Sequence, residues 1–168
     1  MSNISHLSKI LEKVVANQLL KHTNNIMEIY QSAYKPNHST ETALIRVCDD
    51  IKLAMDNKKG TVLVMIDLSA AFDTIDHSIL LNRLKVRYGI IDSVLKWFTS
   101  YITGRTQKVN IEDEYSLAFP LKTGVPQGSV LGPLLFSLYL QPLGDIIRSH
   151  NLMFHQYADD LQLYSHFK

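Results

Sequence analysis

The spacing of hydrophobic and polar positions divides the chain into helical and strand-like segments. Apolar residues three and four positions apart predict helices over residues 4–22, 39–57, 77–88, 92–102 and 134–147. Gly89 and Gly104 follow two of these segments, where glycine is a common helix stop. The expected buried stripes comprise Ile4, Leu7, Ile10, Leu11, Val14, Val15, Gln18 and Leu19 in the first helix, and Ala43, Leu44, Val47, Ile51, Leu53 and Ala54 in the second.

Shorter apolar segments predict strands. Residues 61–67 form a continuous apolar run after Gly60, which is typical of a strand buried on both faces. Residues 108–111 and 117–121 flank an acidic segment, 112–114, and predict a hairpin. Near the C-terminus, the pattern predicts a strand, a turn made of Asp159 and Asp160, and a second strand.

Composition narrows the class of protein without defining it. The chain has 168 residues, of which 46% are hydrophobic and 20% charged, as expected of a single globular domain. One cysteine excludes a disulfide framework and a cysteine-rich zinc site. The net charge of +1 permits a polyanionic partner but does not require one. No secretory signal or membrane-spanning run is visible, so we expect an intracellular protein.

Acidic residues stand at the ends of apolar strands. Asp67 ends the run that begins after Gly60, and Asp159 and Asp160 stand at the tip of the C-terminal hairpin. If these strands are neighbours, the carboxylates meet in a small volume and repel one another unless a cation neutralises them. Such oxygen ligands suit Mg²⁺, and a pair of ions supports phosphoryl transfer. Equally, Asp159 and Asp160 could form a polar turn and Asp67 an ordinary strand end.

Four motifs, in order, resemble those of reverse transcriptases, in the non-LTR (LINE-type) form. Tyr157–Asp160 resembles the Y-A-D-D motif, Val64–Asp73 the first catalytic motif, Gly124–Pro133 the motif between them, and Gln31–Thr40 a fingers segment. A lone Y-A-D-D would be weak evidence, but four ordered motifs that span nearly the whole chain are specific. The resemblance makes the polar-turn interpretation of the acids the weaker one.

The resemblance implies a two-metal nucleotidyl transferase that copies an RNA template into DNA. By this resemblance Asp67, Asp159 and Asp160 are catalytic and hold two Mg²⁺ ions, with Mn²⁺ as a substitute, and the backbone carbonyl of Leu68 assists. The second acid of the motif, Asp160, has the less defined role. The implied partners are an RNA template, a DNA primer and a deoxynucleoside triphosphate (dNTP), with no membrane.

Five further positions match residues that contact substrate in the family. Phe72 matches the steric gate that blocks a ribose 2′-hydroxyl, although it could equally be a core residue. Gln127 and Gly128 match a nucleotide-contacting pair, or form a plain loop before a helix. Tyr157 would pack near the primer end, or is an ordinary strand aromatic. Lys35 could contact primer, template or nucleotide phosphate, or be a solvated loop charge.

The expected fold class is α+β. It consists of a polymerase-type palm, an antiparallel sheet with helices packed on one side, and a partial helical fingers region. By family resemblance, residues 1–60 are partial fingers and residues 61–168 are palm. The quoted motifs include no counterpart of a thumb, which holds the template–primer duplex, so we expect this fragment to be weak or inactive in synthesis.

Two alternative functions remain. One is a catalytically inactive retrotransposon remnant that binds nucleic acid weakly at most. The other is a different palm enzyme, such as an RNA-templated RNA polymerase or a nucleotide cyclase, against which Phe72 argues because an aromatic gate excludes ribonucleotides. The resemblance implies a nuclear location, and the oligomeric state is left open.

Overall fold

The computed structural model describes residues 5–68, 70–112 and 114–168. Parts of three predictions therefore lie outside the described residues: Ile4 in the first stripe, Ser69 in the first catalytic motif and Asp113 at the hairpin tip. The chain divides into two compact units, one formed by residues 1–24 and 72–139 and the other by residues 25–71 and 140–168. Each unit is discontinuous in sequence, and the division into fingers and palm near residue 60 stays a prediction.

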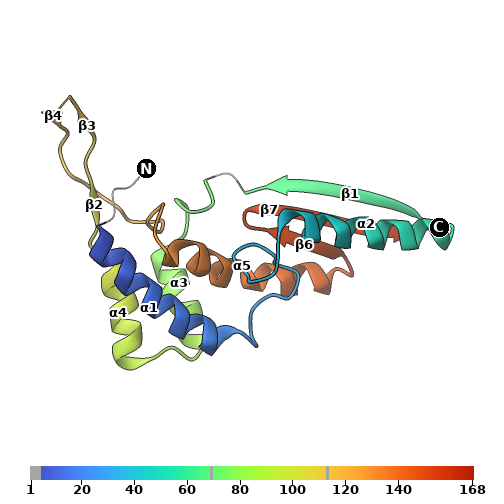
Figure 1. The fold of residues 1–168 in the computed structure, drawn as a ribbon, viewed down its shortest axis with the longest axis horizontal. Helices are drawn as coiled ribbons and strands as arrows, with labels where there is room; N and C mark the ends of the chain where they lie inside the picture. The colour runs from blue at the N-terminus through green and yellow to red at the C-terminus, as the bar shows by residue number, and fades with distance from the viewer. Residues whose placement is uncertain (1–4, 69, 113) are drawn as a thin grey trace. The chain divides into compact units, whose positions relative to one another are not determined.

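The second unit contains a three-stranded antiparallel sheet in the order β1-β7-β6 (Figure 1). Its strands are β1 (Gly60–Asp67), β6 (Met153–Tyr157) and β7 (Asp160–Phe167). The helix α2 (Thr40–Asp56) and the second half of α5 (Leu131–Ser149) belong to the same unit. The sheet and these helices form as the apolar spacing predicts, so the α+β fold class is confirmed.

Helices cover both faces of this sheet, not one as expected. The Tyr164 hydroxyl donates to the carboxylate of Asp50 on α2. The next residue along the strand, Leu163, packs against a cluster that contains Ile147 of α5 and Phe154 of β6. Because neighbouring strand residues point to opposite faces, α2 and α5 lie on opposite sides of the sheet.

Strand β1 is not buried on both faces, which corrects the prediction. Every residue from Val62 to Asp67 is exposed, and Met65 has 71% of its surface accessible. β1 pairs with β7 on one side, and among the described residues no strand pairs with its other edge. A continuous apolar run indicates that both faces of a strand could be buried, but burial also needs neighbouring elements on both faces. Here α2 and β7 cover only part of β1.

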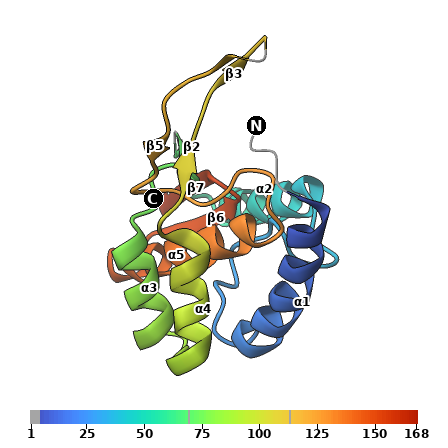
Figure 2. The same cartoon turned by 90° about the vertical axis from the view of Figure 1, so that its left-hand side faces the viewer.

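The first unit is built from helices that pack around the first half of α5. They are α1 (His6–Thr23), α3 (His77–Val86) and α4 (Asp92–Ile102), and α3 packs directly against α4 (Figure 2). Tyr88 ties the unit together, because its carbonyl contacts His22 of α1 and its hydroxyl donates to the carbonyl of Leu138. The fully buried residues include Leu80, Leu84, Phe98, Ile102, Leu131, Leu135 and Phe136.

Two predicted helical stripes are only partly buried. In α1 the buried positions are Glu12, Ala16, Leu19 and Thr23, whereas Leu7, Ile10, Leu11 and Val14 are exposed. In α2 the prediction holds for Ala43, Val47 and Ala54 but not for Leu44 and Leu53, which are exposed. Apolar spacing located both helices correctly, but a polar residue, Glu12, occupies the buried face of α1, where its carboxylate bonds to the start of α5.

The hairpin predicted from residues 108–111 and 117–121, between α4 and Gly124–Pro133, is present, but its strands pair differently. β2 (Thr106–Gln107) pairs with β5 (Phe119–Pro120), and β3 (Asn110–Ile111) pairs with β4 (Glu114–Tyr115). The β3–β4 end points away from α3 and α4 within this unit (Figures 1 and 2). Within the described residues, no helix is both long enough and apolar enough to cross a bilayer.

Glu12 anchors α1 to the start of α5. Its side chain is 2% exposed, and its carboxylate accepts hydrogen bonds from the backbone N–H groups of Val130, at 2.6 Å, and Leu131, at 3.2 Å. The Ser8 hydroxyl donates to the other carboxylate oxygen at 3.1 Å. The first N–H groups of a helix lack partners within the helix and attract negative charge, so a buried glutamate is stable here.

Replacing this carboxylate by an amide should destabilise the protein. We expect Glu12→Gln to lower the free energy of unfolding by about 1–2 kcal/mol, because charged hydrogen bonds to a helix N-terminus are lost. Urea unfolding followed by circular dichroism measures the change. The matched control is Glu114→Gln on the exposed strand β4, which should change the free energy by less than about 0.5 kcal/mol. Equal losses in the two variants would contradict the assigned role of Glu12.

Candidate active site

The register of the sheet brings the predicted catalytic acids to one end of the second unit. Asp67, the last residue of β1, pairs directly with Asp160, the first residue of β7. Side chains of a directly opposed antiparallel pair project to the same face, with Cβ atoms about 5 Å apart. Two like charges in this arrangement destabilise a strand pair unless something neutralises them.

Asp159 lies in the turn beside this pair. Tyr157 pairs with Asp160, so the loop between β6 and β7 has only two residues, Ala158 and Asp159. The predicted turn of Asp159 and Asp160 is therefore shifted by one residue, because Asp160 already pairs across the sheet. The backbone carbonyl of Asp159 accepts a hydrogen bond from the Leu68 N–H at 3.2 Å, which joins the turn to the end of β1.

The acids are accessible rather than enclosed in apolar surroundings. Asp67 and Asp160 are exposed and Asp159 is half-buried. Over the described residues, no group of three or more histidine, cysteine, aspartate or glutamate side chains is arranged to hold a metal ion. The Leu68 carbonyl accepts a hydrogen bond from the Ala71 N–H at 3.1 Å.

The chemistry of this donor set fits Mg²⁺. Proteins hold Mg²⁺ through one or two carboxylates, while water and substrate phosphates supply the remaining oxygens. The opposed pair Asp67 and Asp160, with Asp159 in the adjacent turn, supplies carboxylates of this kind. A closed cluster of three protein ligands is therefore not required for a substrate-bound magnesium site.

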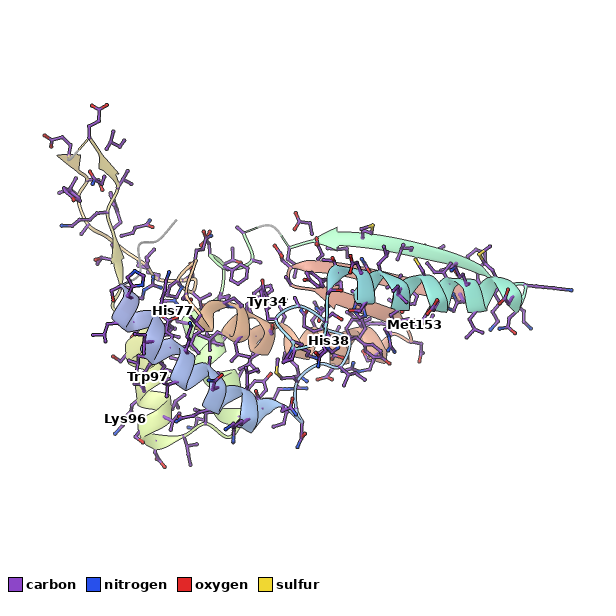
Figure 3. All side chains as sticks on the ribbon, viewed as in Figure 1. Tyr34, His38, His77, Lys96, Trp97 and Met153 are labelled. Atoms are coloured by element: carbon purple, nitrogen blue, oxygen red, sulfur yellow. The ribbon has the colours of Figure 1, made fainter. Side chains whose placement is uncertain are left out.

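The segment between α1 and α2 lies along β6 next to the acids. Gln31 forms a parallel bridge with Gln156, and Tyr34, labelled in Figure 3, follows in the same segment. Partial burial raises the pKa of Tyr34, and the negative charge of Asp159 and the phenol of Tyr157 raise it further. The backbone of Tyr34 has a positive φ of 62°. Tyr34 thus stands within electrostatic range of a predicted catalytic acid.

Lys35 is held within its own segment instead of being a solvated charge. Its ammonium donates a hydrogen bond to the backbone carbonyl of Glu28 at 2.5 Å. Burial lowers the pKa of Lys35, and the negative charge of Glu28 opposes that shift. The Glu28 carboxylate also pairs with Arg148 at 3.0 Å. A contact of Lys35 with primer or template stays a prediction.

The remaining predicted residues, Phe72, Gln127 and Gly128, belong to the other unit. Phe72 is half-buried and packs against Phe136, with ring centroids 4.8 Å apart, so it contributes to the core of this unit. The Gln127 side-chain amide donates to the Asp73 carboxylate at 3.1 and 3.2 Å. Gly128 has a positive φ of 79°, a conformation that favours glycine.

The loop that carries Gln127 is fixed to the chain after Phe72. The Val125 N–H donates to the Phe72 carbonyl at 2.9 Å, and the carbonyl of Gly124 contacts the buried imidazole of His77 at 2.8 Å. A Cβ atom at Gly124 would come within 3.0 Å of the Asp73 backbone. Glycine is therefore needed where these two segments approach.

Comparison with known proteins identifies the family. The family model described as "Reverse transcriptase (RNA-dependent DNA polymerase)" matches residues 1–168. The chain therefore belongs to the reverse transcriptase family, in the form found in LINE-type elements.

Curated relatives from Drosophila melanogaster extend this result. The chain is 32% identical to "Probable RNA-directed DNA polymerase from transposon BS" over 97% of its length, and 30% identical to "RNA-directed DNA polymerase from mobile element jockey" over 95%. In both cases it spans 18% of the relative's length. The activities of those whole proteins therefore enter only as proposals.

Solved structures with low sequence identity share the fold. The apo telomerase of Candida tropicalis, truncated from its C-terminal domain, matches with a TM-score of 0.68 at 16% identity, covering 94% of this chain and 34% of that one. Telomerase of Candida albicans matches with a TM-score of 0.68 at 13% identity, covering 95% of this chain and 30% of that one. These matches support the mixed helix and antiparallel sheet architecture.

Sequence reasoning overlooked two residues near the acids. Gln31 and Tyr34 both lie in the Gln31–Thr40 motif, but the motif was read for its charged residue, Lys35. Gln31 could have been noticed in the sequence as an uncharged amide in a loop, because such a side chain can hydrogen-bond to both N–H and carbonyl groups of the backbone. The proximity of Tyr34 to Asp159 depends on the pairing of this segment with β6, which apolar periodicity does not encode.

His155, in β6 just before the turn, should make stability depend on pH. Its pKa is lowered from an ordinary value of 6.5 to about 4, chiefly by burial and next by the positive charge of Arg46. The charges of His38 and Lys35 act in the same direction and Asp50 opposes them. In the folded chain the imidazole is held neutral beside the Ser32 hydroxyl, at 2.8 Å.

Below pH 6.5 the unfolded chain binds a proton on this residue that the folded chain does not. The free energy of unfolding is therefore highest above pH 6.5, where neither state is protonated at His155. It falls as the pH drops toward 4, by up to about 1.4 kcal/mol per pH unit. Urea unfolding at pH 7 and pH 5 measures it. His155→Gln should reduce the difference between the two pH values, whereas His150→Gln, at an exposed position, should preserve it. An unchanged difference in His155→Gln would assign the pH dependence to other groups.

Proposed function

We propose that this chain is the RNA-directed DNA polymerase domain of a non-LTR retrotransposon and transfers nucleotides by a two-metal mechanism. The observation that carries the proposal is the register that sets Asp67 opposite Asp160 with Asp159 in the adjoining turn, in a chain that matches the reverse transcriptase family over its full length. The proposed substrates are a primer 3′-hydroxyl, a dNTP and an RNA template. The curated relatives carry names of the same activity.

The carboxylates of Asp67, Asp159 and Asp160, with the Leu68 carbonyl, are the proposed ligands for Mg²⁺ or Mn²⁺. When bound, these ions lower the pKa of the primer hydroxyl and neutralise charge on the triphosphate. The residues themselves hold oxygen donors at the end of a rigid strand pair, which fixes where the reacting groups meet. Tyr157, directly opposite Asp160, is the proposed neighbour of the primer end, and the proposed location is the nucleus.

A second candidate is a catalytically inactive remnant that binds nucleic acid weakly at most. It is favoured by the lack, over the described residues, of three acidic, histidine or cysteine side chains arranged around one point. The modest net charge of +1 is consistent with it as well. The two candidates differ in whether the acids bind divalent ions and support dNTP incorporation.

Removing one predicted ligand tests the polymerase proposal. We expect Asp159→Asn to reduce Mg²⁺-dependent dNTP incorporation on an RNA template and DNA primer by at least about a hundredfold, because a lost metal ligand costs several kcal/mol of transition-state stabilisation. Primer extension with the full chain measures it. The control is Asp56→Asn, which removes an exposed acid of α2 and should retain the wild-type rate.

Thermal unfolding with added Mg²⁺ gives a readout that does not depend on activity. Ions that bind the folded chain raise its melting temperature. The increase should be present in the wild type and in Asp56→Asn and reduced in Asp159→Asn. A wild type that incorporates no dNTP and gains no stability from Mg²⁺ would support the inactive remnant, and incorporation that survives Asp159→Asn would contradict the ligand role.

Phe72 is the proposed discriminator between deoxyribonucleotides and ribonucleotides. We expect Phe72→Val to lower the selectivity for dNTP over ribonucleoside triphosphate by about tenfold or more, because a smaller side chain leaves room for the 2′-hydroxyl. The ratio of incorporation rates measures this and is independent of the fraction of folded protein. Phe119→Val, at an exposed position of β5, is the control. An unchanged ratio would mean that Phe72 only packs against Phe136. It would also remove the argument against an RNA-templated RNA polymerase or a nucleotide cyclase.

A further inference from the structure

The buried side chain of Gln31 connects the loop between α1 and α2 to the turn that carries Asp159. It is 2% exposed and lies in the segment between α1 and α2. Its backbone runs parallel to the end of β6, where the Gln156 N–H donates to the Tyr30 carbonyl at 2.8 Å and the Ser32 N–H donates to the Gln156 carbonyl at 3.0 Å. This pairing brings the Gln31 side chain to the β6–β7 turn.

The Gln31 side-chain amide makes three hydrogen bonds, and two of them go to one turn residue. Its nitrogen donates to the Ala158 carbonyl at 3.2 Å, and its oxygen accepts from the Ala158 N–H at 3.1 Å. The oxygen also accepts from the Ala33 N–H at 2.9 Å. A side-chain amide offers a donor and an acceptor at the same end, whereas an ionised glutamate only accepts and a methionine thioether is at most a weak acceptor, so glutamine fits this arrangement better than either.

The turn needs such support because its backbone is unfavourable for alanine. Ala158 has a φ of 56°, in the left-handed region that L residues seldom adopt. Both polar backbone groups of Ala158 bond to Gln31, and the carbonyl of the next residue, Asp159, bonds to the Leu68 N–H. The turn is therefore held from one side by Gln31 and from the other by the end of β1.

We propose that Gln31 is a positioning residue that fixes the orientation of Asp159 for nucleotide transfer. The inference rests on the proposed polymerase function. Gln31 itself does not contact the reacting groups. It holds the peptide groups on either side of Ala158 and thereby sets the direction in which the following carboxylate leaves the backbone. Its loss leaves the acids present but badly oriented.

Amide hydrogen exchange tests the clamp without any need for activity. We expect Gln31→Met, which keeps the length of the side chain and removes both polar groups, to lower the exchange protection of the Ala158 N–H by about tenfold, the effect of losing one hydrogen bond. Gln31→Glu keeps the acceptor and loses the donor, so its loss of protection should be smaller. NMR of the full chain reads both amides, Ala158 and Ala33.

The matched control is Gln141→Met. Gln141 is also a buried glutamine of this unit, but its amide donates to the Ile26 carbonyl and not to the turn. It should leave the protection of Ala158 unchanged relative to that of the other sheet amides. Equal losses in Gln31→Met and Gln141→Met, or losses spread evenly over the sheet, would show general destabilisation and overturn the clamp.

Steady-state incorporation then tests the positioning role. Gln31→Met should lower kcat for dNTP addition by about tenfold or more and leave KM for dNTP nearly unchanged, since a misplaced ligand affects the transition state more than substrate binding. Gln31→Glu should recover part of the rate. A rise in KM with constant kcat would overturn the positioning role. If the wild type incorporates no dNTP and gains no stability from Mg²⁺, the polymerase proposal fails, and the exchange measurement still decides whether Gln31 holds the turn.

Discussion

The antiparallel register between β1 and β7 determines where the acidic residues of the candidate site lie. It sets Asp67 opposite Asp160 and continues in step to Gly60 opposite Phe167. Because side chains alternate along a strand, a shift of one residue would turn Asp67 toward the other face and separate the carboxylates. The same register places Tyr164 toward α2 and Leu163 toward α5, so helix packing and acid placement depend on one alignment.

Two buried polar side chains hold the backbone beside predicted motifs. Glu12 lies outside the four motifs, and Gln31 is the first residue of the fingers motif. In one unit, Glu12 of α1 holds the N-terminus of α5, which directly follows the loop of Gln127 and Gly128. In the other unit, Gln31 holds the turn of Ala158 and Asp159. In both cases a buried polar side chain satisfies backbone groups that regular structure leaves unpaired. These bonds explain why Glu12 and Gln31 are buried although their side chains are polar.

Sequence reasoning located nearly every helix and strand, because most have a clear period and a recognisable end, such as Gly89 after α3 or Gly104 after α4. It also found Asp67 and the Tyr157–Asp160 motif. It failed where burial depends on neighbours distant in the chain: β1 is exposed despite its apolar run, and Leu44 and Leu53 of α2 face outward. The hydrogen bonds of Gln31 could not be predicted, since they follow from a bridge between segments more than a hundred residues apart.

The exposed β1 strand has a practical consequence for work with this chain. Its outer edge has unpaired backbone groups among the described residues, and Val62, Val64 and Met65 present apolar surface beside it. An open edge of this kind is a template on which another copy can add a strand. We therefore expect the isolated chain to aggregate at high concentration. A charged or proline substitution along this edge is the direct way to raise the concentration at which it stays in solution.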